Sequence, residues 1–240
     1  EKSDYQKSLD YYFHVYRLET LYNHSKRIGL VFENIGETYF RLEEYDSAYQ
    51  YISRAIIEYE KEPDLLHFIS ALNLSGKIKY EKNQLDSALA LFQKVIKISR
   101  NSGVEYQRGI ALYNMGLIHK KQEKIDSAVN LFNEAKTIFQ TIGRKKEESE
   151  ALLTLGELYM DNPKKGMAKK HLMLSLEISK EIGARDIQMK GLYAYSRLKK
   201  KQKQYKSSLA YYETFSALKD SLFNEEKSRQ IVEIQNRFWV

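Results

Sequence analysis

The chain repeats a short segment that starts at a glycine and ends, twelve residues later, at an alanine. This segment reads GETYFRLEEYDSA from Gly36 to Ala48, GKIKYEKNQLDSA from Gly76 to Ala88 and GLIHKKQEKIDSA from Gly116 to Ala128. A fourth copy joins Gly156 to Ala168, so the two small residues recur every forty residues. Small residues at a fixed spacing within an apolar pattern mark places where paired helices cross closely. We therefore expect a helical repeat array rather than a compact enzyme domain.

Other positions keep the same forty-residue period. Four residues after each alanine position stands a bulky residue: Ile52, Phe92, Phe132, Leu172 and Tyr212. A fifth copy carries serine at both small positions, and residues 5–15 match residues 45–55. We expect five repeats at 29–68, 69–108, 109–148, 149–188 and 189–228. A partial repeat, the second helix of a preceding unit, is expected at 1–28, and a C-terminal capping or connecting helix at 229–240.

Each repeat reads as two helices joined by a short polar turn. Apolar residues follow helical spacing on both sides of the turn, as in 105–121 and 125–142. Asp46, Asp86 and Asp126 stand at or near the start of the second helix, where they meet free amides and the positive end of the helix dipole. Gly103, Gly143 and Gly183 recur near its end, where a left-handed glycine terminates a helix at little cost.

Composition agrees with a helical array. The apolar share is 42%, the charged share is 30% and there are only two prolines, as expected for helices that each bury one stripe. No run of eighteen apolar residues occurs, so no membrane-spanning segment is expected within the 240 residues. The absence of cysteine excludes disulfides, thiolate metal sites and cysteine nucleophiles.

The repeat resembles the tetratricopeptide repeat family. Counted from Gly29, the repeat is small at position 8, aromatic or aliphatic at 17, small at 20, bulky at 24 and small at 27. The family's usual period is about 34 residues, so six extra residues per repeat would lengthen the helices around the inter-repeat turn. The fourth repeat departs from the pattern at Asn162-Pro163 and Gly166, and the fifth at Ser196 and Ser208, so looser packing is expected there. The resemblance implies an all-α, right-handed solenoid of antiparallel helix pairs.

The resemblance also implies a concave groove, lined by the first helices, that receives a protein or peptide. The groove positions are Glu33, Asn34, Glu37, Asn73, Lys77, Tyr113, Asn114, Lys120, Leu153, Glu157, Tyr193 and Arg197. Asn34 and Asn114 match a family asparagine that often contacts the ligand backbone. A solvated helix face is the alternative interpretation of this set, and a structural role in holding the neighbouring helix is the alternative for the asparagines.

Basic residues concentrate near the fifth repeat. They are Lys190, Arg197, Lys199, Lys200, Lys201, Lys203 and Lys206, with no acid among residues 190–206, and their number equals the chain's formal excess of +7. Such a patch could meet phosphates, an acidic partner or anionic lipid, or it could be a solvated face. No nucleic-acid-binding module accompanies it, so nucleic acid is a disfavoured partner.

Catalytic motifs are missing from the sequence. It contains no Gly-x-Gly phosphate loop, no Gly-x-Ser-x-Gly elbow and no His-Glu-x-x-His pair, and the five histidines share no ligand spacing. We expect no catalytic residue, metal or cofactor, and a function in binding a protein or peptide. Association of two copies is left open.

Residues 220–231, DSLFNEEKSRQI, resemble the segment that ends the repeat region of many bacterial membrane-bound regulators. In those proteins, extracytoplasmic repeats precede a membrane helix and then a histidine kinase or a DNA-binding domain. The resemblance favours the sensory region of a bacterial signalling protein, outside the cytoplasm. The alternatives are a cytosolic scaffold without membrane attachment, and a fragment of a kinase or DNA-binding regulator whose activity lies in other residues.

Overall fold

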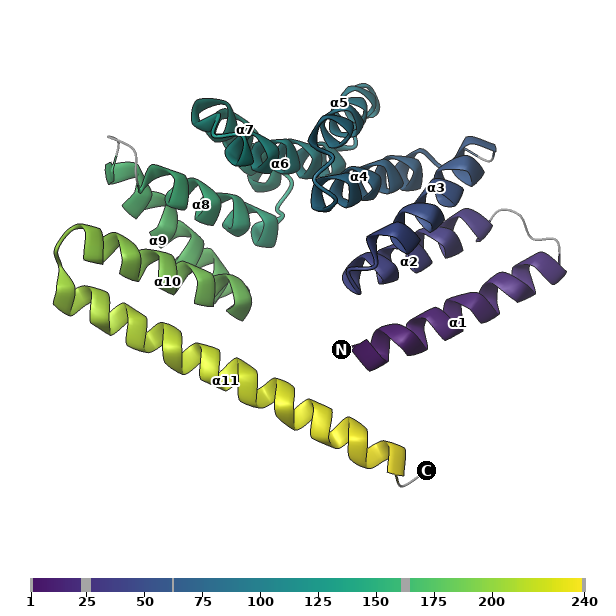
Figure 1. Ribbon diagram of the computed structural model, residues 1–240. Helices are drawn as coiled ribbons and strands as arrows, with labels where there is room; N and C mark the ends of the chain where they lie inside the picture. Colours follow the sequence, from purple (N-terminus) through teal and green to yellow (C-terminus); the bar gives the residue numbers. More distant parts are fainter. Residues whose placement is uncertain (1, 23–26, 62, 161–164, 239–240) are drawn as a thin grey trace. The chain divides into compact units, whose positions relative to one another are not determined.

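A computed structural model describes residues 2–22, 27–61, 63–160 and 165–238, and the regular elements in these ranges are α-helices (Figure 1). They are α1 (Lys2–Leu21), α2 (Ile28–Arg41), α3 (Tyr45–Lys61), α4 (Leu65–Glu81), α5 (Leu85–Ser102), α6 (Glu105–Lys121), α7 (Ile125–Thr141), α8 (Lys145–Tyr159), α9 (Lys165–Glu181), α10 (Arg185–Lys201) and α11 (Tyr205–Phe238). Successive helices pack as antiparallel pairs, so the expected all-α fold is confirmed. The right-handed winding and the limits of the five repeats stay predictions.

The helices belong to two compact units, residues 1–135 and residues 136–240, and the boundary falls within α7. In the first unit α2 packs on α3 and α4 on α5, while α3 also contacts α4 and α5 also contacts α6. In the second unit α9 packs on both α8 and α10, and α10 packs on α11. Second helices thus pack between their own first helix and the next one.

Glycines of the recurring column lie where paired helices pack with no room for a side chain. A Cβ atom on Gly76 of α4 would lie 2.6 Å from a ring carbon of Phe92 of α5, and one on Gly116 of α6 would lie 2.7 Å from Phe132 of α7. Both rings are fully buried. No side chain fits between the backbone and these rings, so the predicted helix crossing is confirmed at both positions.

Two series of left-handed residues terminate the helices. Gly103, Gly143 and Gly183 end the second helices with φ near +70°, as predicted. A second series is not glycine and lies at the turns inside the pairs α2–α3, α4–α5, α6–α7 and α10–α11. There Glu43, Asn83, Glu123 and Lys203 have φ from 58° to 62°. After each of these the next amide donates to the carbonyl five residues earlier, as from Glu44 to Tyr39 at 3.0 Å. This Schellman arrangement satisfies the last carbonyls of the helix.

The aspartates of the second helices lie in the first turn, at Asp46, Asp86 and Asp126. In α5 the N-cap residue is Gln84, which makes no side-chain capping bond. Asp86 therefore acts from the first turn, through its charge near the helix N-terminus.

Serine replaces the small residues of the fifth pair without leaving a polar gap. The Oγ of Ser196 donates to the carbonyl of Ser208 at 3.0 Å, and the Oγ of Ser208 donates to the carbonyl of Ser196 at 3.0 Å. Ser149 and Ser175 make the same exchange between α8 and α9, at 2.9 and 2.8 Å. Direct hydrogen bonds therefore join the helices at both pairs of serines, and the expected looser packing stays a prediction. Asn162 and Pro163 lie outside the described residues.

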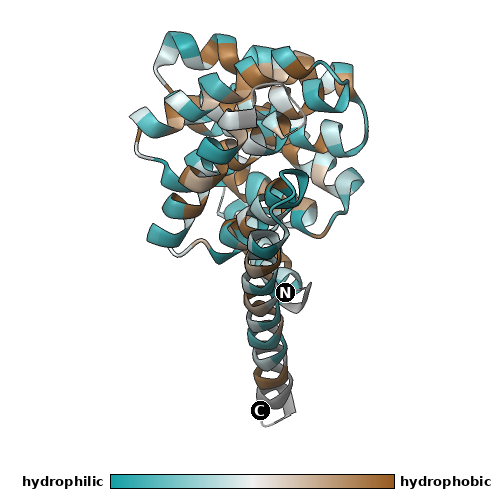
Figure 2. Cartoon of the chain, turned by 90° about the vertical axis from the view of Figure 1, so that its left-hand side faces the viewer, coloured by the Kyte–Doolittle hydropathy of each residue, from teal (hydrophilic) through white to brown (hydrophobic). Residues whose placement is uncertain are grey.

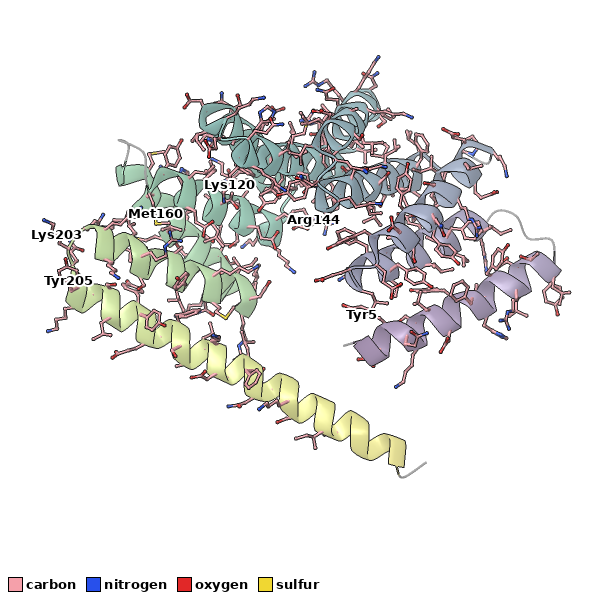
Figure 3. All side chains as sticks on the ribbon, in the orientation of Figure 1. Tyr5, Lys120, Arg144, Met160, Lys203 and Tyr205 are labelled. Atoms are coloured by element: carbon pink, nitrogen blue, oxygen red, sulfur yellow. The ribbon has the colours of Figure 1, made fainter. Side chains whose placement is uncertain are left out.

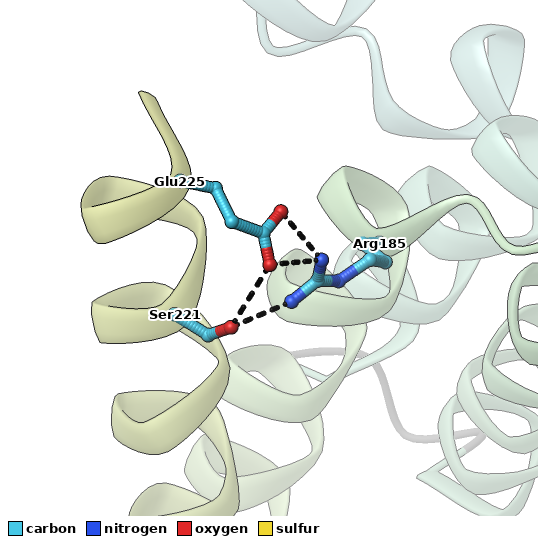
Figure 4. A network of polar contacts seen from close by, with 3 residues as sticks. All are labelled: Arg185, Ser221 and Glu225. Carbon is cyan, nitrogen blue, oxygen red and sulfur yellow. Dashed lines mark hydrogen bonds and ion pairs between the residues drawn. The ribbon is translucent and has the colours of Figure 1, made fainter. Parts of the chain in front are cut away.

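The C-terminal capping or connecting helix predicted at 229–240 is, over its described residues 229–238, part of a longer helix. Helix α11 runs without a break from Tyr205 to Phe238, so residues 220–238 extend the second helix of the last pair. Hydrophilic and hydrophobic stretches alternate along it (Figure 2). Arg185, at the start of α10, is held to α11 by Glu225, with 2.7 Å from its Nη1 to both carboxylate oxygens, and by Ser221 at 2.8 Å (Figure 4).

Candidate functional site

The twelve predicted groove residues all lie on first helices. Those of the first unit are Glu33, Asn34 and Glu37 on α2, Asn73 and Lys77 on α4, and Tyr113, Asn114 and Lys120 on α6. Those of the second unit are Leu153 and Glu157 on α8, and Tyr193 and Arg197 on α10. Because α2 contacts α4 and α4 contacts α6, equivalent positions of the first unit share one face.

Glu33 is buried and joins three helices rather than facing solvent. Its Oε2 accepts a hydrogen bond from the hydroxyl of Tyr59 on α3 at 2.6 Å, and lies 2.9 Å from Nδ1 of His67 on α4. The ring of His67 also stacks on Tyr59, with 5.8 Å between centroids. Burial, followed by the bond to Glu33, raises the pKa of Tyr59, so its hydroxyl stays protonated and donating. The carboxylate therefore ties α2 to its two neighbours.

Asn73 makes the equivalent link between the next two first helices. Its Nδ2 donates to the carbonyl oxygen of Gln107 at 2.9 Å and to the Oε1 of the same residue at 2.7 Å. Glu33 to His67 and Asn73 to Gln107 both span 34 residues, so the same position of two repeats holds the next first helix. Leu153, at this position in α8, is buried as an apolar side chain. Burial takes these three residues out of the solvent-facing part of the predicted groove.

The other predicted residues of the first unit are half-buried and form what we name the ligand face: Asn34, Glu37, Lys77, Tyr113, Asn114 and Lys120. Glu37 pairs with Arg41 at 2.6 Å. The ammonium of Lys77 lies 5.4 Å from the ring centroid of Phe40. Tyr113 packs edge-on against Phe132 with 5.2 Å between centroids. The face thus offers an aromatic ring, both charges and amides above the buried links.

The two asparagines of the ligand face differ from Asn73. Among the described residues, no side-chain hydrogen bond involves Asn34 or Asn114. An amide that is half-buried and unpaired can donate and accept at once, which suits the backbone of an extended peptide.

In the second unit, Glu157 is half-buried, and Tyr193 and Arg197 are exposed on α10. Tyr193 packs against Phe215 of α11 at 5.1 Å between centroids, and the guanidinium of Arg197 lies 5.9 Å from the Tyr193 ring.

The basic patch covers α10, the following turn and the start of α11. Lys190, Arg197, Lys200, Lys201, Lys203 and Lys206 are exposed, and Lys199 is half-buried. Lys199 donates to Oε1 of Gln204 at 2.9 Å and lies 5.3 Å from the ring of Tyr195. Lys203 and Tyr205 stand together at the α10–α11 turn (Figure 3).

A groove between α10 and α11, named here the end groove, was not predicted as a unit. It encloses about 350 Å³ and its walls carry Tyr193, Arg197 and Lys200 from α10, and Tyr205, Leu209 and Tyr212 from α11. Its floor is the Ser196–Ser208 pair. The sequence could have indicated each wall separately, because the wall residues of each helix are spaced so that they lie on one face of that helix. Only the pairing of α10 with α11 shows that the two faces meet.

No group of three potential metal ligands occurs in the described ranges. Burial lowers the pKa of His119 and that of His171. Both histidines are therefore assigned to helix packing. His171 stacks on Tyr159 at 5.6 Å between centroids. None of the helices in the described part is both long and apolar enough to cross a membrane.

Sequence comparison matches residues 69–102 and 110–141 to the tetratricopeptide repeat family. No curated protein gives a significant match to the sequence.

Solved structures share the fold at low identity. BtubC from P. vanneervenii has a TM-score of 0.73 at 13% identity, covering 92% of this chain and 91% of that one. The Rap conjugation gene regulator of plasmid pLS20, in complex with the Phr* peptide, has a TM-score of 0.70 at 16% identity, with coverage of 93% and 71%. Aspartyl phosphate phosphatase F from Bacillus subtilis has a TM-score of 0.64 at 14% identity, with coverage of 81% and 60%.

Proposed function

We propose that the chain is a non-catalytic module that binds a protein or peptide on the ligand face of α2, α4 and α6. The observation that carries the proposal is that the amides of Asn34 on α2 and Asn114 on α6 are half-buried and make no side-chain hydrogen bond within the described residues. Below them, the buried contacts of Glu33 and Asn73 fix the spacing of the three helices. A ligand would therefore meet donors, acceptors and apolar surface that are already in place, which lowers the entropic cost of binding.

The test starts from a phage-displayed library of random linear peptides selected on the purified chain. Selected peptides are then titrated by calorimetry against the wild type and against Tyr113→Ala and Asn114→Ala. We expect Asn114→Ala to weaken binding by about 0.5–1.5 kcal/mol if it removes one neutral hydrogen bond. Asn130→Ala, at an exposed asparagine of α7, is the matched control and should bind as the wild type does.

Lys199→Glu tests the basic patch as the rival site, with the titration repeated at high salt. Full affinity in Tyr113→Ala and Asn114→Ala, with loss only in Lys199→Glu, would move the binding site to the basic patch. Circular dichroism of each variant shows whether a loss of binding comes from unfolding.

We also propose that the module serves bacterial signalling, as the sensory or interaction region of a regulator outside the cytoplasm. One fold relative supports a peptide ligand, since the pLS20 regulator is in complex with the Phr* peptide. A second, a Rap protein, is complexed with competence and sporulation factor, which supports a binding function. Protease treatment of intact spheroplasts tests the location of the native protein. Digestion supports the proposal, and protection would favour a cytosolic scaffold.

The absence of catalysis is part of the proposal, since one fold relative is named a phosphatase. The purified chain should release no phosphate from a phosphorylated response-regulator receiver domain. Phosphate release above the receiver's own rate would contradict it. Activity confined to a longer protein that contains this chain would instead favour a kinase or DNA-binding regulator.

A further inference from the structure

The groove between α2 and α3 is equivalent to the end groove, but another helix covers it. Residues forty apart occupy equivalent positions, so the walls of the end groove correspond to α2 and α3 of the first pair, 160 residues earlier. There the groove is covered by the next first helix, α4, which contacts both α2 and α3. Ala71, Leu74 and Ile78 of α4 pack into the cluster that contains Ile52 of α3. In the second pair, α6 covers the groove with Ala111, Met115 and Ile118.

The same positions are open in the α10–α11 pair. Ile52 is 0% exposed under α4, whereas its equivalent in α11, Tyr212, is 48% exposed. Tyr205 and Leu209 on the same wall are 64% and 58% exposed. The floor requires no polar partner, because Ser196 and Ser208 satisfy each other. An apolar helix face can therefore lie over the end groove without leaving either serine hydroxyl unsatisfied.

The charges around the end groove are reversed relative to the filled one. Helix α4 is basic where it covers α2 and α3: Lys77 lies 5.4 Å from the ring of Phe40, and Lys79 lies 4.0 Å from the ring of Tyr49. Lys82, at its C-cap, pairs with Asp46. Aromatic rings and a carboxylate thus contact these three cations.

In the α10–α11 pair the residue has changed at each position that contacts a lysine of α4 in the first pair. Lys200 and Leu209, which line the end groove, replace Phe40 and Tyr49, and Lys206, on the next turn of α11 beside it, replaces Asp46. Arg197 also replaces Glu37. A basic helix like α4 would meet like charges at these positions, and an acidic helix would meet opposite ones.

We propose that the end groove binds an acidic amphipathic helix of a partner protein. The helix presents small and aliphatic residues with the spacing of Ala71, Leu74 and Ile78, and carboxylates where α4 carries lysines. This is the mode in which a groove receives a helix through anchors at i, i+3, i+4 and i+7. The site is separate from the ligand face of α2, α4 and α6, so the two proposals can fail independently.

The test uses peptides made from the chain's own covering helix. The native peptide has the sequence of residues 64–84, and the acidic peptide is the same with Lys77→Glu, Lys79→Glu and Lys82→Glu. A third peptide scrambles the acidic one, which keeps its charge and removes its apolar stripe. Binding to the 240-residue chain is measured by fluorescence anisotropy. The acidic peptide should bind at least about tenfold more tightly than either of the others.

A charge exchange on the protein locates the site. The double variant Lys200→Glu with Lys206→Glu should bind the acidic peptide at least about tenfold more weakly and the native peptide more tightly than the wild type does. The matched control is Lys169→Glu with Lys180→Glu, at two exposed lysines of α9, which makes the same change in net charge. Peptides selected on the ligand face should bind the double variant normally.

Three results would overturn the proposal. Equal binding of the acidic and scrambled peptides would reduce the interaction to unspecific charge attraction. Unchanged binding in the Lys200→Glu and Lys206→Glu variant would place the site elsewhere. Concentration-dependent association of the chain in sedimentation, abolished by Leu209→Asp, would identify a second copy as the occupant of the end groove.

Discussion

Replacing Gly76 by leucine tests whether the crossing of α4 and α5 holds the repeat together. A Cβ atom at position 76 would lie 2.6, 2.8 and 3.0 Å from three ring carbons of Phe92. The Phe92 ring is fully buried, so it cannot swing into solvent to make room. Overpacking a dense core costs about 1–3 kcal/mol, and a clash with an enclosed ring belongs in the upper half of that range. Removing glycine from a helix interior returns about 0.5–1 kcal/mol. The free energy of unfolding should therefore fall by about 1–2.5 kcal/mol.

The assay is urea unfolding followed by far-ultraviolet circular dichroism. The matched control is Gly166→Leu on α9, where an added Cβ has no neighbour within 4 Å among the described residues. This control should be neutral or stabilising. A double-mutant cycle with Phe92→Ala should show coupling of about 0.5 kcal/mol or more, because the truncated ring leaves space for the leucine. An unchanged transition in Gly76→Leu, or one equal to that of Gly166→Leu, would refute the reasoning.

Three further outcomes are expected. Tyr59→Phe removes the 2.6 Å hydrogen bond to the buried carboxylate of Glu33 and should lower the unfolding free energy by about 1–3 kcal/mol in urea titration; a neutral effect would mean that the bond is dispensable. Gly103→Ala places alanine at φ +71° in open space and should cost about 1–2 kcal/mol through backbone strain alone, whereas Gly166→Ala should not destabilise. Burial lowers the pKa of His171 below its unfolded value near 6.5, so the unfolded chain binds the proton more readily and this contribution to stability is lost as pH falls below about 6.5. His171→Phe should flatten the dependence of the thermal midpoint on pH between about pH 5 and 7, and an identical slope in wild type and variant would contradict this assignment.

Local spacing was enough to predict the elements and their crossings. Gly76 and Phe92 recur with the repeat because a close helix crossing tolerates no side chain at one position and fills the other. Gly103 could be predicted as a helix terminator because glycine adopts positive φ without a Cβ clash. The positive φ of Glu123, 60°, could not be predicted, because glutamate has no preference for that conformation. Its place in the Schellman turn is set by the hydrogen bonds of the turn and by the packing of the two helices that it joins.

At the candidate sites, too, the sequence determined some features and the tertiary structure determined others. The sequence by itself determined that Glu33, Asn73 and Tyr113 share one position of the repeat, because the period is constant. Only the tertiary structure decided that the side chains of Glu33 and Asn73 contact the next first helix instead of facing solvent, since their partners lie 34 residues away. Likewise, the sequence contained the basic residues of α10 and the apolar residues of α11. That these two faces flank one groove follows from the packing of α10 on α11, which depends on contacts between whole helices and not on the spacing within either one.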